Sequence, residues 1–282
     1  MPNIIAIANQ KGGVGKTTTI VNLAASLAAG SHKTLIIDLD PQSNATQSLG
    51  ISLEDGEQHI YDLLVRAASG EELKIVSRTT DMDDLHIIPG FIGAAALERE
   101  LAEFEDREFL LKKILSSSAL SSFDYILLDT PPGLGILTIN ALAAAGTLII
   151  PVQSEYLALE GLTQMVDTVE RIRENFNPEL LKIRVLITLF DHRLRLARAI
   201  ESELRTKLSG DPHLRVCKTM IHRNVRLAEA PSFGLPIILF DPSSSGSDNY
   251  IELSKEVMND ETTRTGQGTG YAPVPLEIAV HP

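Results

Sequence analysis

The chain has 282 residues and a formal net charge of −12 at pH 7, which argues against nucleic acid as a partner of its whole surface. Aromatic residues make up only 5% of the chain, so Ile, Leu, Val and Ala must build the core. No uninterrupted apolar run approaches the roughly 18 residues of a membrane span, and we expect a cytoplasmic protein with no membrane partner. A single cysteine, Cys217, excludes an internal disulfide.

Short β-branched runs alternate with longer helical stretches along the chain. Several runs are continuously apolar, as in strands that helices cover on both faces. This alternation predicts an α/β fold with a doubly wound, mostly parallel sheet. We expect one domain over residues 1–259 and a flexible tail over 260–282, where Gly, Thr and Pro show little helical periodicity. The expected strands are 3–9, 33–39, 85–89, 125–129, 147–152, 182–189 and 236–240.

The first expected strand leads into NQKGGVGKTTT, residues 9–19. Its glycines allow the backbone to turn N–H groups around phosphate oxygens, and the helix expected over 16–29 adds the positive end of its dipole. Lys16 is expected to reach the β and γ phosphates, and the Thr17 hydroxyl to ligate Mg²⁺. The strict pattern G-x-x-x-x-G-K-[ST] is not met, because Gln10 stands where its first glycine would be. The predicted nucleotide site comprises Lys11, Gly12, Gly13, Val14, Gly15, Lys16, Thr17 and Thr18.

Two later strands are expected to end in aspartates. TLIIDLDPQSN, residues 34–44, carries Asp38 and Asp40, which the two-residue period of a strand places on one side of the chain. YILLDTPPG, residues 125–133, closes on Asp129, the usual position of a carboxylate that holds Mg²⁺ through water. Doubly wound sheets bind ligands at this edge, although an aspartate at a strand end can also be a turn or helix cap.

The pattern K-G-G-x-G-K-[ST] at residues 11–17 resembles the hallmark of the deviant Walker A ATPases, the ParA/MinD group. The resemblance implies ATP and Mg²⁺ as cofactors, and a Lys11 that crosses a dimer interface to the partner's nucleotide. It implies that Asp40 orients the attacking water, so that Lys11, Lys16 and Asp40 form the catalytic set. The implied metal set is Thr17, Asp38 and Asp129, and residues 131–133 look like the switch loop that senses the γ phosphate.

Positive charge is concentrated in residues 182–226, which carry eleven Lys or Arg against four acidic residues, a local balance of +7. Such a segment can hold the DNA backbone without reading bases, with an affinity that falls steeply with salt. A solvated helix face is the alternative interpretation of the same charges.

Two stretches of this segment resemble chromosomal ParA (Soj) proteins. LFDHRLRLA, residues 189–197, is similar to a stretch with one DNA-binding arginine, which implies Arg193. IHRNVRLAEAPSFGLPI, residues 221–237, is similar to a stretch with a second one, which implies Arg226. The same similarity implies that His222 and Asn224 lie beside the adenine, although the family usually has proline where this chain has His222. The resemblance covers roughly residues 3–258.

The resemblance implies an ATPase of chromosome or plasmid segregation. It would form a homodimer on ATP, bind DNA nonspecifically at the nucleoid, and be released when a ParB-like centromere-binding protein stimulates hydrolysis. A ParA-like ATPase that positions a protein cargo and an ATP-dependent amide-forming synthetase of the same superfamily remain alternatives. The end of the chain is poor material for a MinD-type membrane helix, because Arg264 is its one basic residue and Pro273 and Pro275 follow. Since the first expected strand starts at residue 3, we do not expect an N-terminal helix-turn-helix domain.

Overall fold

The computed structural model describes residues 1–92, 97–155, 158–211 and 213–262. These residues form an eight-stranded sheet with the order β3-β4-β2-β5-β1-β6-β7-β8. Every neighbouring pair is parallel except β3 with β4, so the predicted doubly wound α/β fold is confirmed. The strands are β1 (Asn3–Ile7), β2 (Thr34–Asp38), β3 (Arg78–Thr79), β4 (Leu85–Ile88), β5 (Tyr125–Asp129), β6 (Thr147–Gln153), β7 (Lys182–Thr188) and β8 (Leu214–Val216).

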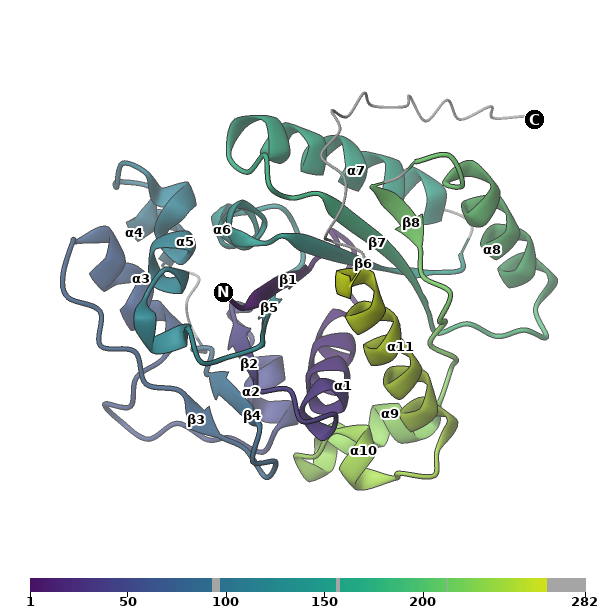
Figure 1. The fold of residues 1–282 in the computed structure, drawn as a ribbon, viewed down its shortest axis with the longest axis horizontal. Coiled ribbons are helices and arrows are strands. Elements are labelled where there is room, and N and C mark those ends of the chain that lie inside the picture. Colours follow the sequence, from purple (N-terminus) through teal and green to yellow (C-terminus); the bar gives the residue numbers. More distant parts are fainter. Residues whose placement is uncertain (93–96, 156–157, 212, 263–282) are drawn as a thin grey trace.

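Helices cover both faces of the sheet, as Figure 1 shows. Alternate residues of β1 and of the position after it divide between two apolar clusters: Ile5 and Ile7 pack into one, and Ala6 and Ala8 into the other. The first cluster is covered by α1 (Lys16–Ala29), α2 (Asn44–Ser48), α9 (Val225–Glu229), α10 (Ile237–Phe240) and α11 (Ser245–Thr262). The second is covered by α3 (Ile60–Ala68), α4 (Leu97–Leu101), α5 (Leu110–Leu115), α6 (Ile136–Ala144), α7 (Ala158–Asn175) and α8 (Arg195–Lys207). Short 3-10 turns lie at η2 (Arg107–Phe109), η3 (Ser118–Leu120) and η4 (Ala230–Phe233).

The strand expected over 236–240 is wrong, because this stretch forms the short helix α10. The backbone N–H of Ile237 donates to the side-chain oxygen of Asn22 on α1 at 2.6 Å, which places the turn against that helix. Ile237 is buried in the same cluster as α1, so the apolar run covers a helix instead of extending the sheet. A short apolar run is compatible with either structure, and only its surroundings decide between them.

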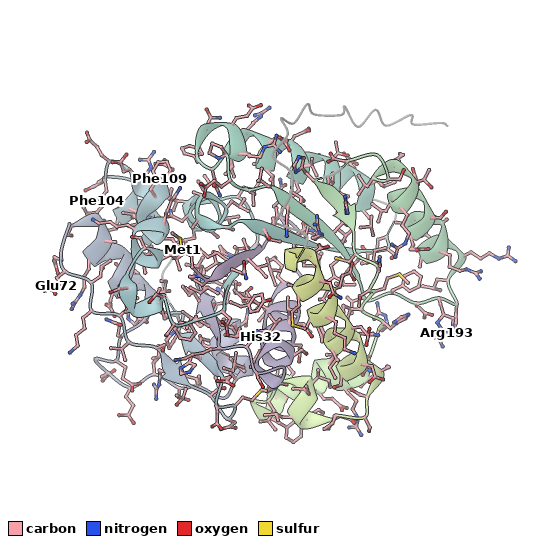
Figure 2. All side chains as sticks on the ribbon, in the orientation of Figure 1. Met1, His32, Glu72, Phe104, Phe109 and Arg193 are labelled. Carbon is pink, nitrogen blue, oxygen red and sulfur yellow. The ribbon has the colours of Figure 1, made fainter. Side chains whose placement is uncertain are left out.

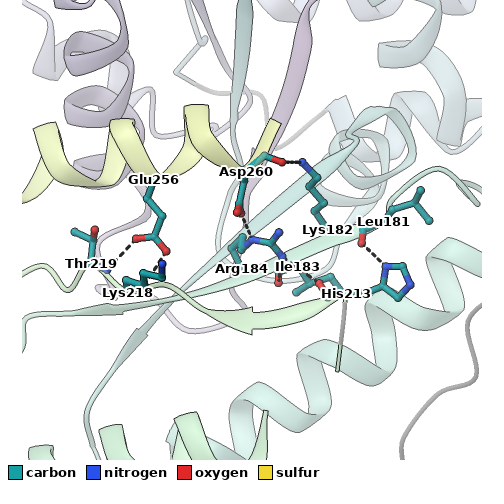
Figure 3. A network of polar contacts seen from close by, with 9 residues as sticks. All are labelled: Leu181, Lys182, Ile183, Arg184, His213, Lys218, Thr219, Glu256 and Asp260. Atoms are coloured by element: carbon teal, nitrogen blue, oxygen red, sulfur yellow. Dashed lines mark hydrogen bonds and ion pairs between the residues drawn. The ribbon is translucent and has the colours of Figure 1, made fainter. Parts of the chain in front are cut away.

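Helix α11 runs to Thr262, beyond the domain boundary expected at 259. Its last turns contact β7 and the segment that follows β8, as Figure 3 shows: Arg184 Nε bonds Asp260 Oδ2 at 2.5 Å, and Lys182 Nζ donates to the Asp260 carbonyl at 2.5 Å. Glu256 accepts the backbone N–H groups of residues 218 and 219 at 2.7 and 2.9 Å. Residues 260–262 therefore continue the folded helix, and the rest of the expected tail, 263–282, lies outside the described residues. Across the described ranges, no helix has the length and apolar character needed to cross a membrane.

Candidate nucleotide-binding site

The carboxyl ends of the central strands bring the glycine loop and the predicted aspartates to one edge of the sheet. The last residue of β1, Ile7, pairs with Asp129 at the end of β5, and Asp129 pairs in turn with Asp38 at the end of β2. The loop that follows β1 thus lies between strands whose ends carry carboxylates. This is the edge at which doubly wound sheets hold ligands.

The loop between β1 and α1 has the backbone conformation of an anion cradle. Gly13 and Gly15 have φ values of 74° and 88°, in the left-handed region that only glycine adopts without strain. Gly15 is the N-cap of α1 and has no side chain that could cap the first N–H groups of the helix. The free N–H groups and the positive end of the helix dipole can therefore face a phosphate group.

Side chains from β6 and β7 hold this loop, and the sequence did not single them out. Thr188 Oγ1 donates to the Val14 carbonyl at 2.8 Å, and Gln153 Nε2 donates to the Gly13 carbonyl at 2.7 Å. Asn9 Nδ2 donates to the carbonyl of Pro151 at 2.7 Å and fixes the start of the loop on β6. Each is a polar residue that closes an apolar strand run, and this is the signal that could have identified them.

The two lysines of the loop point to different partners. Lys16 is buried, and its Nζ donates to the Lys11 carbonyl at 3.2 Å. Burial lowers the pKa of Lys16, while Asp129 and then Asp40 act to raise it. Lys11 instead extends to Glu155 after β6, with an Nζ–Oε2 distance of 2.5 Å, and both side chains are more than half exposed. Lys16 therefore belongs to the interior of the site and Lys11 to its rim.

Asp38 is fully buried and engaged by the protein itself. Its Oδ2 accepts the backbone N–H and the hydroxyl of Thr46 at 2.9 and 2.7 Å, and its Oδ1 accepts the N–H of Asp40 at 3.2 Å. Burial raises the pKa of Asp38 to about 6, against the effect of these hydrogen bonds. In this arrangement Asp38 organises the turn that leads to α2 and carries Asp40.

Asp129 is also fully buried, and no hydrogen bond of ordinary geometry reaches its carboxylate oxygens among the described residues, although the Thr17 hydroxyl lies close enough to lower its pKa. Burial raises its pKa well above the ordinary value, as do Asp38 and Asp40, while Thr17 and Lys16 act in the opposite direction. A buried carboxylate without a partner is costly, and a cation is the group that would satisfy it. No group of three or more His, Cys, Asp or Glu side chains among the described residues could hold a metal ion.

A cleft of about 390 Å³ opens over the loop, and its walls come from both ends of the chain. Asp40 lines it, with Oδ1 fixed by the N–H of Gln42 at 2.9 Å. His222 and Asn224 are not among the described residues that line it: His222 contacts Asn249, and Asn224 caps α9 through the N–H of Arg226. The lining includes Gly12, Gly13, Gly15, Lys16, Thr17, Thr18, Val21, Asn22, Asp40, Pro132, Ala230, Pro231 and Leu235.

The two predicted DNA-binding arginines are exposed and paired with acidic residues of their own segments. Arg193 is 77% exposed, projects from the molecule in Figure 2, and bonds Asp191 through Nε and Nη2 at 2.8 and 2.7 Å. Arg226 is 56% exposed and lies 2.9 Å from Glu229 and 3.2 Å from Asp241. Hydrogen bonds from Arg193 hold the pKa of Asp191 well below its usual range.

The other basic residues of 182–226 divide into two groups. Four are tied to partners within the chain: Lys182, Arg184, Arg205 and Lys207. The rest are exposed and form no ion pair with another described residue: Arg195, Arg198, Arg215, Lys218 and Arg223. The local balance of +7 therefore overstates the charge that an external ligand would meet, and the free charge lies around the start of α8 and residues 215–226.

Comparison with known proteins gives the chain a family. A family model described as an AAA domain matches residues 2–182. The chain is 48% identical over 257 residues to the sporulation initiation inhibitor protein Soj of Bacillus subtilis (strain 168), covering 91% of this chain and 98% of that protein. It is 43% identical over 262 residues to the chromosome partitioning protein ParA of Myxococcus xanthus (strain DK1622), covering 93% of this chain and 90% of that protein.

A solved structure of cobyrinic acid a,c-diamide synthase from Mycobacterium smegmatis, with bound ATP analog and magnesium, is similar with a TM-score of 0.76. Its sequence is 29% identical, and the match covers 93% of this chain and 97% of that one. The glycine loop, the buried Lys16 and the buried Asp129 suit the same two ligands. The chain therefore belongs to the AAA domain family and, within it, to the Soj/ParA partitioning ATPases, which use ATP and Mg²⁺.

Proposed function

We propose that this ATPase dimerises on ATP, binds DNA without sequence preference through Arg193 and Arg226, and serves chromosome or plasmid segregation at the nucleoid. A ParB-like centromere-binding protein would stimulate hydrolysis and release the dimer. The observation that carries the proposal is the pair of exposed arginines, which lie on two segments near the carboxyl edge of the sheet, where the nucleotide site is. The names of the Soj and ParA relatives support the same biological role.

Each residue of the cleft has a role that its surroundings support. Magnesium, when bound, would neutralise charge on the β and γ phosphates. Lys16 offers an ammonium with little water around it, so its attraction to a phosphate is weakly screened. Thr17 lines the cleft and Asp129 ends β5, and the two would hold the ion. Asp38 fixes the turn that carries Asp40. Asp40 is placed at the cleft wall, where its carboxylate would orient a water molecule for attack.

Lys11 is proposed to reach the nucleotide of a second subunit. Its ion pair with Glu155 is exposed, and such pairs contribute only about 0–1 kcal/mol, so the lysine can exchange its partner. Lys11→Ala should bind ATP as a monomer and fail to dimerise, which sedimentation or light scattering would measure. Glu155→Gln is the matched control, because it removes the partner but keeps the lysine, and it should dimerise. An ATP-dependent dimer of Lys11→Ala would contradict this role.

DNA binding is proposed to depend on the dimer, which would present both arginines twice. Asp191, Glu229 and Asp241 now pair with these arginines, and a DNA backbone would replace those carboxylates. The test is a salt series of anisotropy titrations on two unrelated duplexes, with ATP, with ADP and without nucleotide. We expect binding only with ATP, equal on both duplexes, and with a steep dependence on salt.

An ATP-dependent amide-forming synthetase is the second candidate function, because the Mycobacterium smegmatis structure carries the name of such an enzyme. The higher identity to Soj and ParA favours segregation. Absence of DNA binding at low salt with ATP would reverse that preference. An ATPase that positions a protein cargo shares the proposed DNA-binding cycle, and identification of the protein captured by the ATP-bound dimer would separate it from a segregation ATPase.

A further inference from the structure

Strand β7 ends at Thr188, whose buried side chain contacts the glycine loop between β1 and α1 (residues 8–15), called the phosphate loop from here on. The hydroxyl donates to the Val14 carbonyl at 2.8 Å, in the peptide group that joins Val14 to Gly15. In a trans peptide the C=O and N–H point in opposite directions, and the described chain contains no cis peptide. Because the Val14 carbonyl points toward Thr188, the Gly15 N–H points away from Thr188. Gly15 itself lines the nucleotide cleft.

The residues after Thr188 lead directly to the first arginine. Leu189 has a φ of 51°, a left-handed conformation that is unfavourable for a residue with a Cβ and that redirects the chain at the end of β7. Phe190 follows, and the Asp191 carboxylate then accepts hydrogen bonds from the backbone N–H and the Nε of Arg193. Only a few residues separate the hydroxyl that orients the loop from an arginine on the surface.

The segment that carries the second arginine is paired with the same strand end. Ile221 N–H donates to the Ile187 carbonyl at 2.9 Å, and Phe190 N–H donates to the Ile221 carbonyl at 3.0 Å. Arg223 N–H donates to the Phe190 carbonyl at 3.0 Å, which completes an isolated parallel bridge between Phe190 and His222. The rings of Phe190 and His222 add an edge contact at 5.7 Å between centroids. Both arginine segments are thus joined next to Thr188.

We propose that Thr188 is a positioning residue that couples the phosphate loop to the two arginine segments. A phosphate that accepts the Gly15 N–H favours the peptide orientation that Thr188 bonds, and so favours the conformation of residues 188–190 and their pairing with 221–223. By linkage, DNA on the arginines stabilises the same loop orientation. The coupling rests on the proposed DNA-binding function for its biological purpose, but its physical basis is independent of DNA.

Three variants isolate the hydroxyl. Thr188→Val removes the donor and keeps the branched shape, and Thr188→Ser keeps the donor. Thr34→Val is the matched control, since Thr34 is a buried residue of β2 whose hydroxyl donates to the His32 carbonyl at 2.8 Å, outside the site. Should the valine variant fail to fold, Thr188→Ala removes the same donor with a smaller side chain.

The measurement is hydrogen exchange of the amides of residues 188–194 and 219–226, with and without saturating Mg·ATP, with saturation confirmed by titration. In the parent, Thr188→Ser and Thr34→Val, the nucleotide should slow exchange at Phe190 and Arg223 by about five-fold or more, the low end of usual couplings. In Thr188→Val the slowing should fall below about two-fold, although the site is filled. Equal slowing in Thr188→Val and the parent, or no slowing in the parent, would overturn the coupling.

DNA titrations of the same proteins with saturating ATP separate this proposal from the proposed function. Thr188→Val should bind DNA at least about five-fold more weakly, while Arg193→Ala should lose DNA affinity and keep the nucleotide-dependent slowing. A parent that shows the slowing but binds no DNA would uphold the coupling and refute DNA binding. If the parent binds DNA but Thr188→Val keeps the full slowing, DNA binding stands and the coupling is refuted.

Discussion

The phosphate loop and the arginine segments differ in how the protein holds their charged groups. Lys16 and Asp129 are buried, and the loop around them is fixed by hydrogen bonds from β6 and β7. Arg193 and Arg226 are mostly exposed and pair with acidic residues close to them in the chain or in space. Catalytic groups gain from a single fixed arrangement, whereas a nonspecific grip on a polyanion needs cations that can change partner. The contrast predicts large effects of substitution in the first region and graded effects in the second.

Lys16→Gln gives the sharpest test of the buried region. It removes a cation that is scarcely screened by water, so ATP affinity should fall by about 10²-fold or more. Titration with labelled ATP measures this, and Lys11→Ala is the control, because it removes the same charge from the exposed rim of the same loop. Equal loss in both variants would abolish the distinction between interior and rim.

Asp40→Ala should separate chemistry from binding within the same cleft. A carboxylate that orients water contributes to the reaction rate, so hydrolysis should fall by about 10²-fold while ATP affinity stays near the parental value. Steady-state hydrolysis and labelled-ATP titration together test this. Asp83→Ala makes the same change at an exposed position outside the cleft and should hydrolyse ATP normally. Hydrolysis at the parental rate in Asp40→Ala would assign the water to another group.

Arg193→Ala and Arg226→Ala test the exposed region. Each should weaken binding to any duplex and reduce the slope of log affinity against log salt by roughly one for each phosphate that the variant no longer neutralises. Basal hydrolysis should survive in Arg193→Ala, since that residue lies outside the cleft. Lys207→Ala removes a charge of the same basic segment that is held by Glu203, and should change the slope little. An equal slope change for Lys207→Ala would mean that charge alone matters, wherever it lies.

Asp191→Asn should have the smallest effect, and in the opposite direction. It releases Arg193 from a carboxylate whose pKa the hydrogen bonds of that arginine hold well below its usual range. Because a solvent-exposed ion pair is weak, DNA affinity with ATP should rise by no more than about five-fold. Anisotropy at low salt detects this. A decrease in affinity would show that Asp191 positions Arg193 for DNA instead of competing for it.

The elements that were predicted correctly are encoded by local sequence. Six expected strands match to within two residues, because their apolar runs are bounded by polar or turn residues, and α1 begins and ends at the expected residues 16 and 29. The edge strands β3 and β8 were missed, because runs of two and three residues carry no readable period.

The supports of the site could not be predicted in the same way. Thr188 and Gln153 lie 174 and 140 residues from the loop carbonyls that they bond, and only the strand order brings them together. The partners of the basic residues posed the same difficulty: Asp260, which holds Arg184, falls in the stretch expected to be a tail. A count of charges along the chain contains no information about which of them the fold neutralises.

The two shortest strands have a consequence for how the folded protein behaves in concentrated solution. A sheet edge exposes unpaired N–H and C=O groups on which another chain can add a strand, and a long flat edge invites aggregation. Here the seven-residue strands β6 and β7 are paired on both sides, while the sheet of the described residues ends in β3, with two residues, and β8, with three. Folded molecules therefore offer little template for sheet extension, and self-association through strands should follow unfolding, when the long apolar strands become exposed.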